Sequence, residues 1–384
     1  MKLSCLPYGL KVALKTANPA VAKRATSPIL EHVMLSANGD GILAVSATNL
    51  EIGIRTRIMA KIDEPGMITV PARTLSDLVN VLPDERIDLE MNGKAVSLAL
   101  ACGRTHANVK GMPGQEFPVI PDYSQDDGLP TLTVQPADLG KALSRTVFSA
   151  ASDDNRPTLT CVYMHTADGR LAFASADGFR MSVQRTGIVG DFPDLLIPKA
   201  ALAEVQKLVA NESEPVRIVA NKAQEASQVA FIFSDTHLVA QLVTGGFPDY
   251  TQIIPKEHSV KITLSPSALH RAIKTALVFG KLSAGIVRWT VGGDQVTISG
   301  ASAETGDQTS TIPAEIEGAL DVPADGKSEF ALNGHYVLNV LDALGLGRVS
   351  QVQITGTIPS SPFVIRTPED ENYTHVLMPM HLGR

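Results

Sequence analysis

The sequence predicts an α+β fold in which one type of domain occurs three times along the chain. Its 384 residues exceed what a single core supports, since cores rarely grow past about 250 to 300 residues, and they divide into three units of 128. A Pro-x-x-Leu element recurs at nearly that period. Each recurrence precedes helical and then strand-like patterning, which favours helices packed on one side of antiparallel sheets.

The first helix of each unit begins at a proline. The element lies at Pro7–Leu10, Pro136–Leu139 and Pro266–Leu269, at spacings of 129 and 130 residues. Proline at the first helical position loses no intrahelical hydrogen bond, and its fixed φ suits a helix. The alternating segments Thr131–Val134 and Val260–Leu264 precede two of the copies, which predicts a strand that leads into the helix.

Strand-like runs separated by glycine and aspartate turns follow each first helix. The runs span residues 29–35 and 42–45, 159–164 and 171–174, and 286–291 and 296–298. The turns lie at residues 38–41, 167–169 and 292–294. Such turns between β-rich runs indicate hairpins, so each unit continues with antiparallel strands.

A second helix and further strands complete each unit. The second helices are predicted to open from Val70-Pro71-Ala72, Ile197-Pro198-Lys199 and Leu332-Asn333-Gly334. The units close on two apolar residues and a proline, at residues 119–121, 253–255 and 377–379. Each unit therefore consists of two half-repeats of strand, helix and strands, and the predicted domains span residues 1–126, 127–255 and 256–384.

The charge of the chain is segregated. Its 33 Lys and Arg against 40 Asp and Glu give a net charge of −7, yet residues 1–30 and 258–293 contain ten basic residues and no acid. The remaining residues carry −17. Two helices with solvated basic faces would also explain the pattern, so the segregation alone does not predict a polyanionic partner.

The basic residues share a place in the repeat. Two of them lie about one turn apart on each predicted first helix, opposite its apolar side. The pairs are Lys11 and Lys15, Lys141 and Arg145, and Arg271 and Lys274. A unit of this length can fold alone, unlike a solenoid repeat of about 20 to 50 residues. Similar domains that follow one another around an axis can close a ring on symmetric association, and basic helices lining it would let a polyanion pass.

Four motifs in order on this repeat carry a resemblance to a known family. They are Ala72-Arg73, Ala176-Asp177-Gly178-Phe179-Arg180, Phe247-Pro248-Asp249-Tyr250 before Ile253-Ile254-Pro255, and the terminal Met378-Pro379-Met380-His381-Leu382. Over essentially its whole length the chain resembles the bacterial DNA sliding clamps, the beta subunits of the replicative DNA polymerase III holoenzyme.

The resemblance implies three clamp domains with inner helices and outer antiparallel sheets, assembled head to tail into a ring-shaped homodimer. Such a ring encircles double-stranded DNA without sequence specificity and tethers replicative and repair polymerases through a peptide-binding groove. The expected function is that of a cytoplasmic, non-catalytic processivity factor without cofactor or metal. Its expected partners are DNA, a second copy, the polymerase catalytic subunit, the clamp loader and other proteins that carry clamp-binding peptides.

The resemblance also implies three sets of site residues. DNA contacts are expected at Arg24, Arg73, Lys11, Lys15, Lys141, Arg145, Arg271 and Lys274. The peptide groove is expected at Leu159, Ala176, Gly178, Phe179, Arg180, Met181, Pro248, Gln252, Ile253, Pro362, Val376, Met378, Pro379, Met380 and Leu382. The dimer interface is expected at Arg104, His106, Leu277, Val278 and Glu304, with Asp307 as a second acidic residue.

Three positions depart from the family pattern. Phe179 stands where a histidine is common, Gln252 stands where a basic residue is common, and Gly383-Arg384 extend past the usual end. These departures leave open which peptides the chain prefers. They also leave open whether it is a main clamp or a second, specialised one.

Two other classes of protein compete with this interpretation, an enzyme and a repeat-built adaptor that binds proteins but no DNA. The sequence has no Gly-rich phosphate loop, no Gly-x-Ser-x-Gly and no His/Cys cluster with metal spacing. Cys5, Cys102 and Cys161 are odd in number and far apart, which excludes a disulfide framework. No apolar run approaches the roughly 18 to 20 residues of a membrane span, and no signal peptide is seen, so the cytoplasm is expected.

Overall fold

The computed structural model describes residues 1–24, 27–124, 128–153, 155–223, 226–280, 285–322 and 328–381. The chain divides into two compact units, one of Met1–Pro136 with Glu204–Leu242 and one of Ala137–Ala203 with Val243–Arg384. In the described ranges no helix is long and apolar enough to cross a membrane.

Six α-helices occur in the described residues, and all six begin where the sequence predicts. They are α1 (Pro7–Ala17), α2 (Ala72–Val81), α3 (Pro136–Thr146), α4 (Lys199–Val209), α5 (Pro266–Gly280) and α6 (Gly334–Leu344). Proline is the first residue of α1, α3 and α5. The start of α6 is capped by Asn333, whose side chain accepts hydrogen bonds from two backbone N–H groups of the first turn.

The first unit contains two antiparallel sheets. The five-stranded sheet has the order β5 (Lys61–Glu64), β1 (Lys2–Cys5), β7 (Ile87–Asn92), β8 (Ser97–Cys102), β9 (Thr105–Lys110). The nine-stranded sheet has the order β10 (Met112–Pro113), β6 (Gly66–Pro71), β2 (His32–Ala37), β3 (Ile42–Thr48), β4 (Ile52–Met59), β18 (Thr236–Gln241), β17 (Ala226–Ile232), β16 (Val216–Ala223), β11 (Thr131–Val134). The latter joins strands from the first and second predicted domains.

The second unit is built on one twelve-stranded antiparallel sheet. Its order is β15 (Leu195–Pro198), β12 (Cys161–Ala167), β13 (Arg170–Ala176), β14 (Arg180–Val189), β26 (Asp370–Leu377), β25 (Phe363–Thr367), β24 (Val352–Gly356), β19 (Val260–Leu264), β22 (Gly306–Gly318), β21 (Gln295–Ser302), β20 (Ile286–Gly292), β23 (Glu329–Asn333). It joins the second and third predicted domains through β14 and β26.

The predicted hairpins β2/β3, β12/β13 and β20/β21 are confirmed. Two expected strands begin later than predicted, at His32 and Cys161, because 3-10 helices occupy Pro28–Glu31 and Pro157–Thr160. In both cases a proline leads the segment, and it fixes a helical φ and removes a donor that a strand ladder would need.

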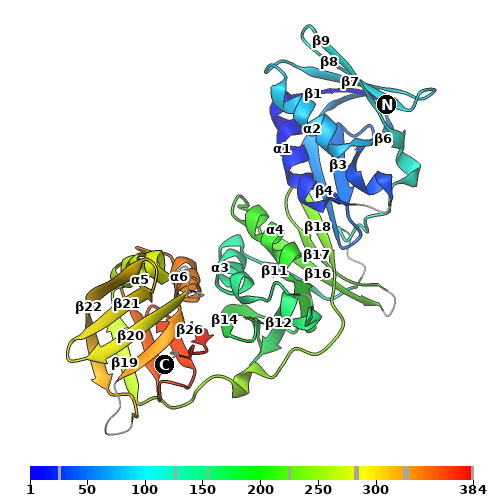
Figure 1. Ribbon diagram of the computed structural model, residues 1–384. Helices are drawn as coiled ribbons and strands as arrows, with labels where there is room; N and C mark the ends of the chain where they lie inside the picture. Colours follow the sequence, from blue (N-terminus) through cyan, green and yellow to red (C-terminus); the bar gives the residue numbers. More distant parts are fainter. Residues whose placement is uncertain are drawn as a thin grey trace. The chain divides into compact units, whose positions relative to one another are not determined.

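Helix pairs cover the sheets within each unit. In Figure 1 α1 lies beside α2 in the first unit and α5 beside α6 in the second, and α1 packs on β3 and β4 while α5 packs on β20, β21 and β22. Leu10 and Leu14 of α1 are buried, whereas Tyr8 and Lys15 are exposed. Each helix thus contributes one apolar face to a core and leaves a polar face free.

The two strand pairs that join predicted domains have equivalent registers. We call the β4/β18 pair the first seam and the β14/β26 pair the second seam. Gly53 pairs with Val239 in the first, and Met181 pairs with Val376 in the second. Glu51 accepts a hydrogen bond from the backbone N–H of Gln241 at 2.8 Å, and the carbonyl of Phe179 accepts one from Met378 at the same 2.8 Å. In both bonds the acceptor is a backbone carbonyl.

A linker packs into each seam. Phe117, Ile120 and Tyr123 of the first linker are buried against Val239. Tyr250 of the second linker is buried against Met181 and Val376, with Phe247 and Ile254 half-buried beside it. Each linker therefore uses a phenylalanine and the residue three positions later to fix a seam.

Candidate functional site

The first helices α1 and α5 present basic side chains to solvent. Lys15, Arg271 and Lys274 are exposed and Lys11 is half-buried. In the part of the chain that the structure describes, no ion pair engages any of the four. Arg73 at the start of α2 is 95% exposed in its side chain and has only a loose partner, Asp77, at 3.7 Å. Such charges are available to phosphates.

The basic residues of α3 are used inside the molecule, which corrects the expectation for Arg145. Its side chain is buried, and its guanidinium donates to the Asp370 carboxylate and, at 3.0 Å, to Oε1 of Gln184. The same guanidinium lies over the Tyr373 ring, 5.1 Å from the centroid. Lys141, which is exposed, places Nζ 2.7 Å from Asp370. Arg145 therefore does not offer its charge to a partner.

Asp370 carries the negative charge of this cluster. Burial raises the pKa of its carboxyl, but the hydrogen bond from Lys141 and the charges of Arg145 and Lys141 outweigh burial, so the pKa lies below its ordinary value. The carboxylate is thus ionised at neutral pH and ties α3 to the start of β26 through the buried arginine.

Replacing Asp370 by alanine is expected to destabilise the second unit by about 3 to 5 kcal/mol, because it leaves the buried Arg145 charge without a partner. Trp289, the single tryptophan, is fully buried in this unit, so its fluorescence during chemical denaturation measures the loss. Lys141→Ala removes the exposed partner of Asp370 and is expected to lower the free energy of unfolding by less than about 1 kcal/mol. Equal losses in both variants would contradict the role given to burial.

The residues expected to form the peptide groove gather around the second seam, in two layers. Phe179, Met378 and Ile253 are 64%, 40% and 42% exposed. Met181 and Val376 are 2% exposed and lie beneath in a small core with Tyr250. The exposed residues Gly178, Pro248 and Gln252 and the half-buried Ala176, Pro362, Pro379 and Met380 complete the described set, and Leu382 lies outside the described residues.

Three members of the expected peptide groove are buried. Leu159, Met181 and Val376 are buried, so they support the surface without forming it. These three apolar residues lie in β-strands or in the short helix before β12. The sequence alone does not indicate which apolar residues near the second seam are buried and which are exposed. We call the exposed trio of Phe179, Ile253 and Met378 the apolar surface of the second seam.

Arg180 is a structural residue at this site. Its guanidinium donates to Asp177 at 2.9 Å, to Oδ1 of Asn339 at 2.8 Å and to the Phe148 carbonyl at 2.8 Å. It also lies 4.2 Å from the centroid of the Tyr336 ring. Asn339 and Tyr336 belong to α6, so the arginine links β14 to a helix of the next predicted domain. Sequence reasoning missed both α6 residues, which sit about 160 positions away.

His375 beside this arginine does not act as a charge. It is fully buried, with Nδ1 2.8 Å from Oγ of Ser182. Burial, and to a lesser extent the Arg180 charge, lowers the pKa of His375 to about 3. The ring therefore stays neutral at physiological pH and packs as an aromatic group against Phe148.

The turn beside each seam has the same backbone but different side chains. Asn49 Oδ1 accepts from the N–H groups of residues 51 and 52 at 3.0 and 2.8 Å. Asp177 Oδ1 accepts from residues 179 and 180 at 2.9 and 3.0 Å. Where the second seam exposes Phe179 and Met378, the first has Glu51 and Gln241. The shared backbone thus carries Phe179 and Met378 at the second seam and Glu51 and Gln241 at the equivalent positions of the first.

The expected dimer residues fall on separate elements. Arg104 and His106 are exposed in the β8/β9 hairpin, and Glu304 is exposed in the turn between β21 and β22. Val278 on α5 is 63% exposed, but Leu277 is 6% exposed and packs against Gly334 at the start of α6. Leu277 therefore belongs to the core of its own unit, and its place in an interface stays a prediction.

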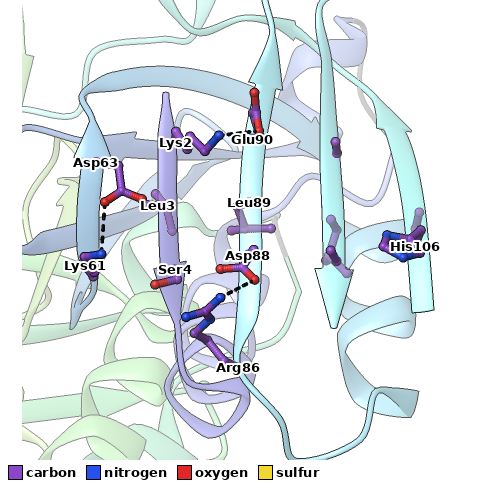
Figure 2. A pocket seen from close by; sticks show the side chains of 14 residues that line it. Lys2, Leu3, Ser4, Lys61, Asp63, Arg86, Asp88, Leu89, Glu90 and His106 are labelled. Carbon is purple, nitrogen blue, oxygen red and sulfur yellow. Dashed lines mark hydrogen bonds and ion pairs between the residues drawn. The ribbon is translucent and has the colours of Figure 1, made fainter. Parts of the chain in front are cut away.

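A pocket of about 420 Å³ lies on the exposed face of the five-stranded sheet. Figure 2 shows three ion pairs there, Lys2 with Glu90, Lys61 with Asp63 and Arg86 with Asp88, at 3.1, 3.4 and 3.0 Å. His106 projects from β9 at its margin. These six charges are paired one to one, so they give the pocket no net positive charge.

Comparison with known proteins identifies the family. The models for the N-terminal, central and C-terminal domains of the DNA polymerase III beta subunit match residues 1–121, 133–249 and 251–381. The beta sliding clamp of Caulobacter vibrioides (strain NA1000 / CB15N) is 28% identical over 394 residues, covering 100% of both chains. That of Synechococcus elongatus is 27% identical over 390 residues, again with 100% coverage of both.

Solved structures agree. A beta sliding clamp of C. crescentus, with polyethylene glycol bound to a proposed beta-motif tethering region, superposes with a TM-score of 0.89 at 27% identity, covering 100% of this chain and 99% of that one. The sliding clamp of Bacillus subtilis, at 24% identity, has a TM-score of 0.89 with complete coverage of both chains and shows the fold alone. The order of three domains is confirmed, while the boundaries at 126/127 and 255/256 stay predictions. With three matching domains that together cover most of its length, the chain belongs to the family of bacterial DNA sliding clamps, the beta subunits of DNA polymerase III, which are non-catalytic processivity factors of DNA replication.

Proposed function

We propose that two copies of this chain close head to tail into a ring around double-stranded DNA and tether polymerases to it. The observation that carries the proposal is the equivalence of the two seams. In each seam the last strand of a domain's first half-repeat pairs with the last strand of the next domain's second half-repeat. The pairs are β4 with β18 and β14 with β26.

By the same pattern of pairing, two strands of the described chain lack the partner strand that a seam would provide. They are β22, which ends the third domain's first half-repeat, and β9, which ends the first domain's second half-repeat. β9 is the edge of its sheet. In the described part of the chain, residues Gly306–Pro313 of β22 pair with β21 on one side only. An open edge of this kind is a template for another strand, and β22 of one copy with β9 of the next would close a ring by twofold symmetry.

Side chains near these edges suit such a contact. Arg104 just before β9 and His106 on it can meet Glu304 just before β22 and Asp307 on it. Val278 adds an exposed apolar group. Residues at an interface of this kind combine apolar contact with complementary charge. The proposed interface comprises Arg104, His106, Val278 and Glu304.

The proposed DNA contacts are the solvated cations of the first and third domains. They are Lys11, Lys15, Arg24, Arg73, Arg271 and Lys274, with Lys141 as a weaker contributor because Asp370 neutralises it. Contacts to phosphates are independent of base sequence and allow sliding. The net negative charge of the remaining chain favours contact through these residues alone.

The proposed polymerase contact is the apolar surface of the second seam. Phe179, Ile253 and Met378 expose apolar groups over a packed support, and methionine adapts to different partner side chains. Partners would be peptides of the replicative polymerase, the clamp loader and repair polymerases. The proposed location is the cytoplasm, where these proteins act.

The test of the ring measures mass and retention on DNA. Analytical ultracentrifugation should give twice the mass of one chain. After loading by a clamp loader, the protein should remain on a nicked circular DNA and leave once the circle is cut. Equal loss from circular and linear DNA, or a monomer at micromolar concentration, would show that the chain does not work as a ring.

A further inference from the structure

A groove of about 1260 Å³ runs along α1 and α2 of the first domain. One wall is the face of α1 from Tyr8 to Lys15, and the other is α2 from Arg73 to Asn80. Apolar groups line much of it, including Val12, which is 44% exposed. The prolines and small apolar residues beside it are Pro19, Val21, Ala22, Pro28 and Pro71. The groove can thus accommodate flat apolar groups.

The charge left free in the groove is positive. Its cations are Lys11, Lys15, Lys23 and Arg73, and its acids are Glu31, Asp77 and Glu204. Asp77 is 3.7 Å from Arg73, and Glu204 is bound at 2.8 Å by Lys207 of α4. Three lysines therefore face one unmatched acid, Glu31. A ligand with repeated negative charges complements this wall.

Tyr8 indicates which form of nucleic acid fits. It is 75% exposed, and it lies three and seven residues before Lys11 and Lys15, on the same side of α1. In the described residues no aromatic ring stacks on it. A duplex keeps the faces of its bases stacked inside, so it offers this ring no partner, whereas an unpaired base exposes both faces.

We propose that the groove binds single-stranded DNA, with an unpaired base stacked on Tyr8 and phosphates neutralised by Lys11, Lys15 and Lys23. The inference deepens the proposed DNA contact and rests on it for the chemistry of the ligand, since the lysines of α1 serve both. It assigns to the first domain a preference for single-stranded over duplex DNA. Contacts to duplex phosphates alone do not create such a preference. Unpaired template beside a primer end is DNA of this class.

The test compares two DNAs on the full-length protein. Fluorescence anisotropy measures the affinity for a labelled oligo-dT of about 20 nucleotides, longer than the sites of about 4 to 16 nucleotides typical of one binding domain, and for a duplex of the same length. Tyr8→Ala is expected to lower the ratio of single-strand to duplex affinity about tenfold, because one stacking contact is lost. Tyr8→Phe keeps the ring and should keep the ratio. Val81→Ala changes a residue that is 79% exposed at the end of α2, outside the groove, and is the matched control.

Four outcomes overturn the proposal. They are no binding of oligo-dT to the wild type, an unchanged ratio in Tyr8→Ala, a loss in Tyr8→Phe as large as in Tyr8→Ala, or an equal loss in Val81→Ala. The proposed function fails by a different readout, the retention of the loaded wild-type ring on circular duplex. The proposal of single-strand binding and the proposal of a ring can therefore fail independently of each other.

Discussion

Proline in place of Asn108 is expected to convert the dimer into monomers and to abolish retention on circular DNA. Cys102 pairs with Thr105 across a two-residue hairpin, so the N–H groups of residues 105, 107 and 109 point to β8 and those of 106 and 108 point outward. Proline removes one outward donor and leaves the β8 ladder intact. Sedimentation gives the mass, and a gel-filtration loading assay gives the retention.

The control for this variant is Asn108→Ala, which changes the same exposed side chain but keeps the backbone N–H. It should remain a dimer and stay on circular DNA. A dimeric Asn108→Pro protein would mean that copies associate without pairing β9 to β22. Monomers from both variants would point to the asparagine side chain as the contact.

The double replacement Phe179→Glu with Met378→Gln is expected to weaken binding of a polymerase-tail peptide at least about 100-fold. The two substitutions place at the second seam the polar side chains that the first seam has at the equivalent positions. The backbone hydrogen bond there is the same in both seams. Burial of a large apolar side chain contributes about 1.5 to 3 kcal/mol, and two such losses correspond to about two decades or more in Kd. Titration of a fluorescent peptide measures the change.

Leu50→Ala is the matched control, because Leu50 is 57% exposed in the equivalent turn of the first seam. It should leave peptide affinity as in the wild type. The double variant should still be retained on circular DNA, which shows that the ring is intact. Unchanged peptide affinity in the double variant would move the binding site away from the second seam.

Local chemistry let the sequence predict most of the fold. Prolines at Pro7, Pro136 and Pro266 mark helix starts because the helix needs no donor there, and glycine turns mark hairpins because they permit positive φ. The starts of the strands expected at residues 29–35 and 159–164 were wrong, because Pro28 and Pro157 each begin a 3-10 helix that extends into the expected strand. Apolar content alone does not distinguish the two.

The site was harder to predict, because its members are distinguished by partners far along the chain. Arg145 lies one place after the equivalent of Lys274 in the repeat, yet Arg145 is buried and Lys274 is exposed, since Asp370 lies beside Arg145 from 225 residues away. Leu277 and Val278 are neighbours, and one faces the core while the other faces solvent. Tyr8 had a local signal, its spacing to Lys11 and Lys15, that could have been used.

Leu50 occupies a backbone position that glycine would suit better. It holds a left-handed backbone, with φ of 75°, at the position where the second domain has Gly178 with φ of 93°. A side chain in that conformation costs about 1 to 2 kcal/mol, so a turn designed afresh would favour glycine. Asn49 and Asp177 nevertheless hold the two turns in the same form, each by accepting hydrogen bonds from two backbone N–H groups that follow it. The conformation of the turn is therefore held by the residue before its left-handed position, so that position tolerates leucine in the first domain and glycine in the second.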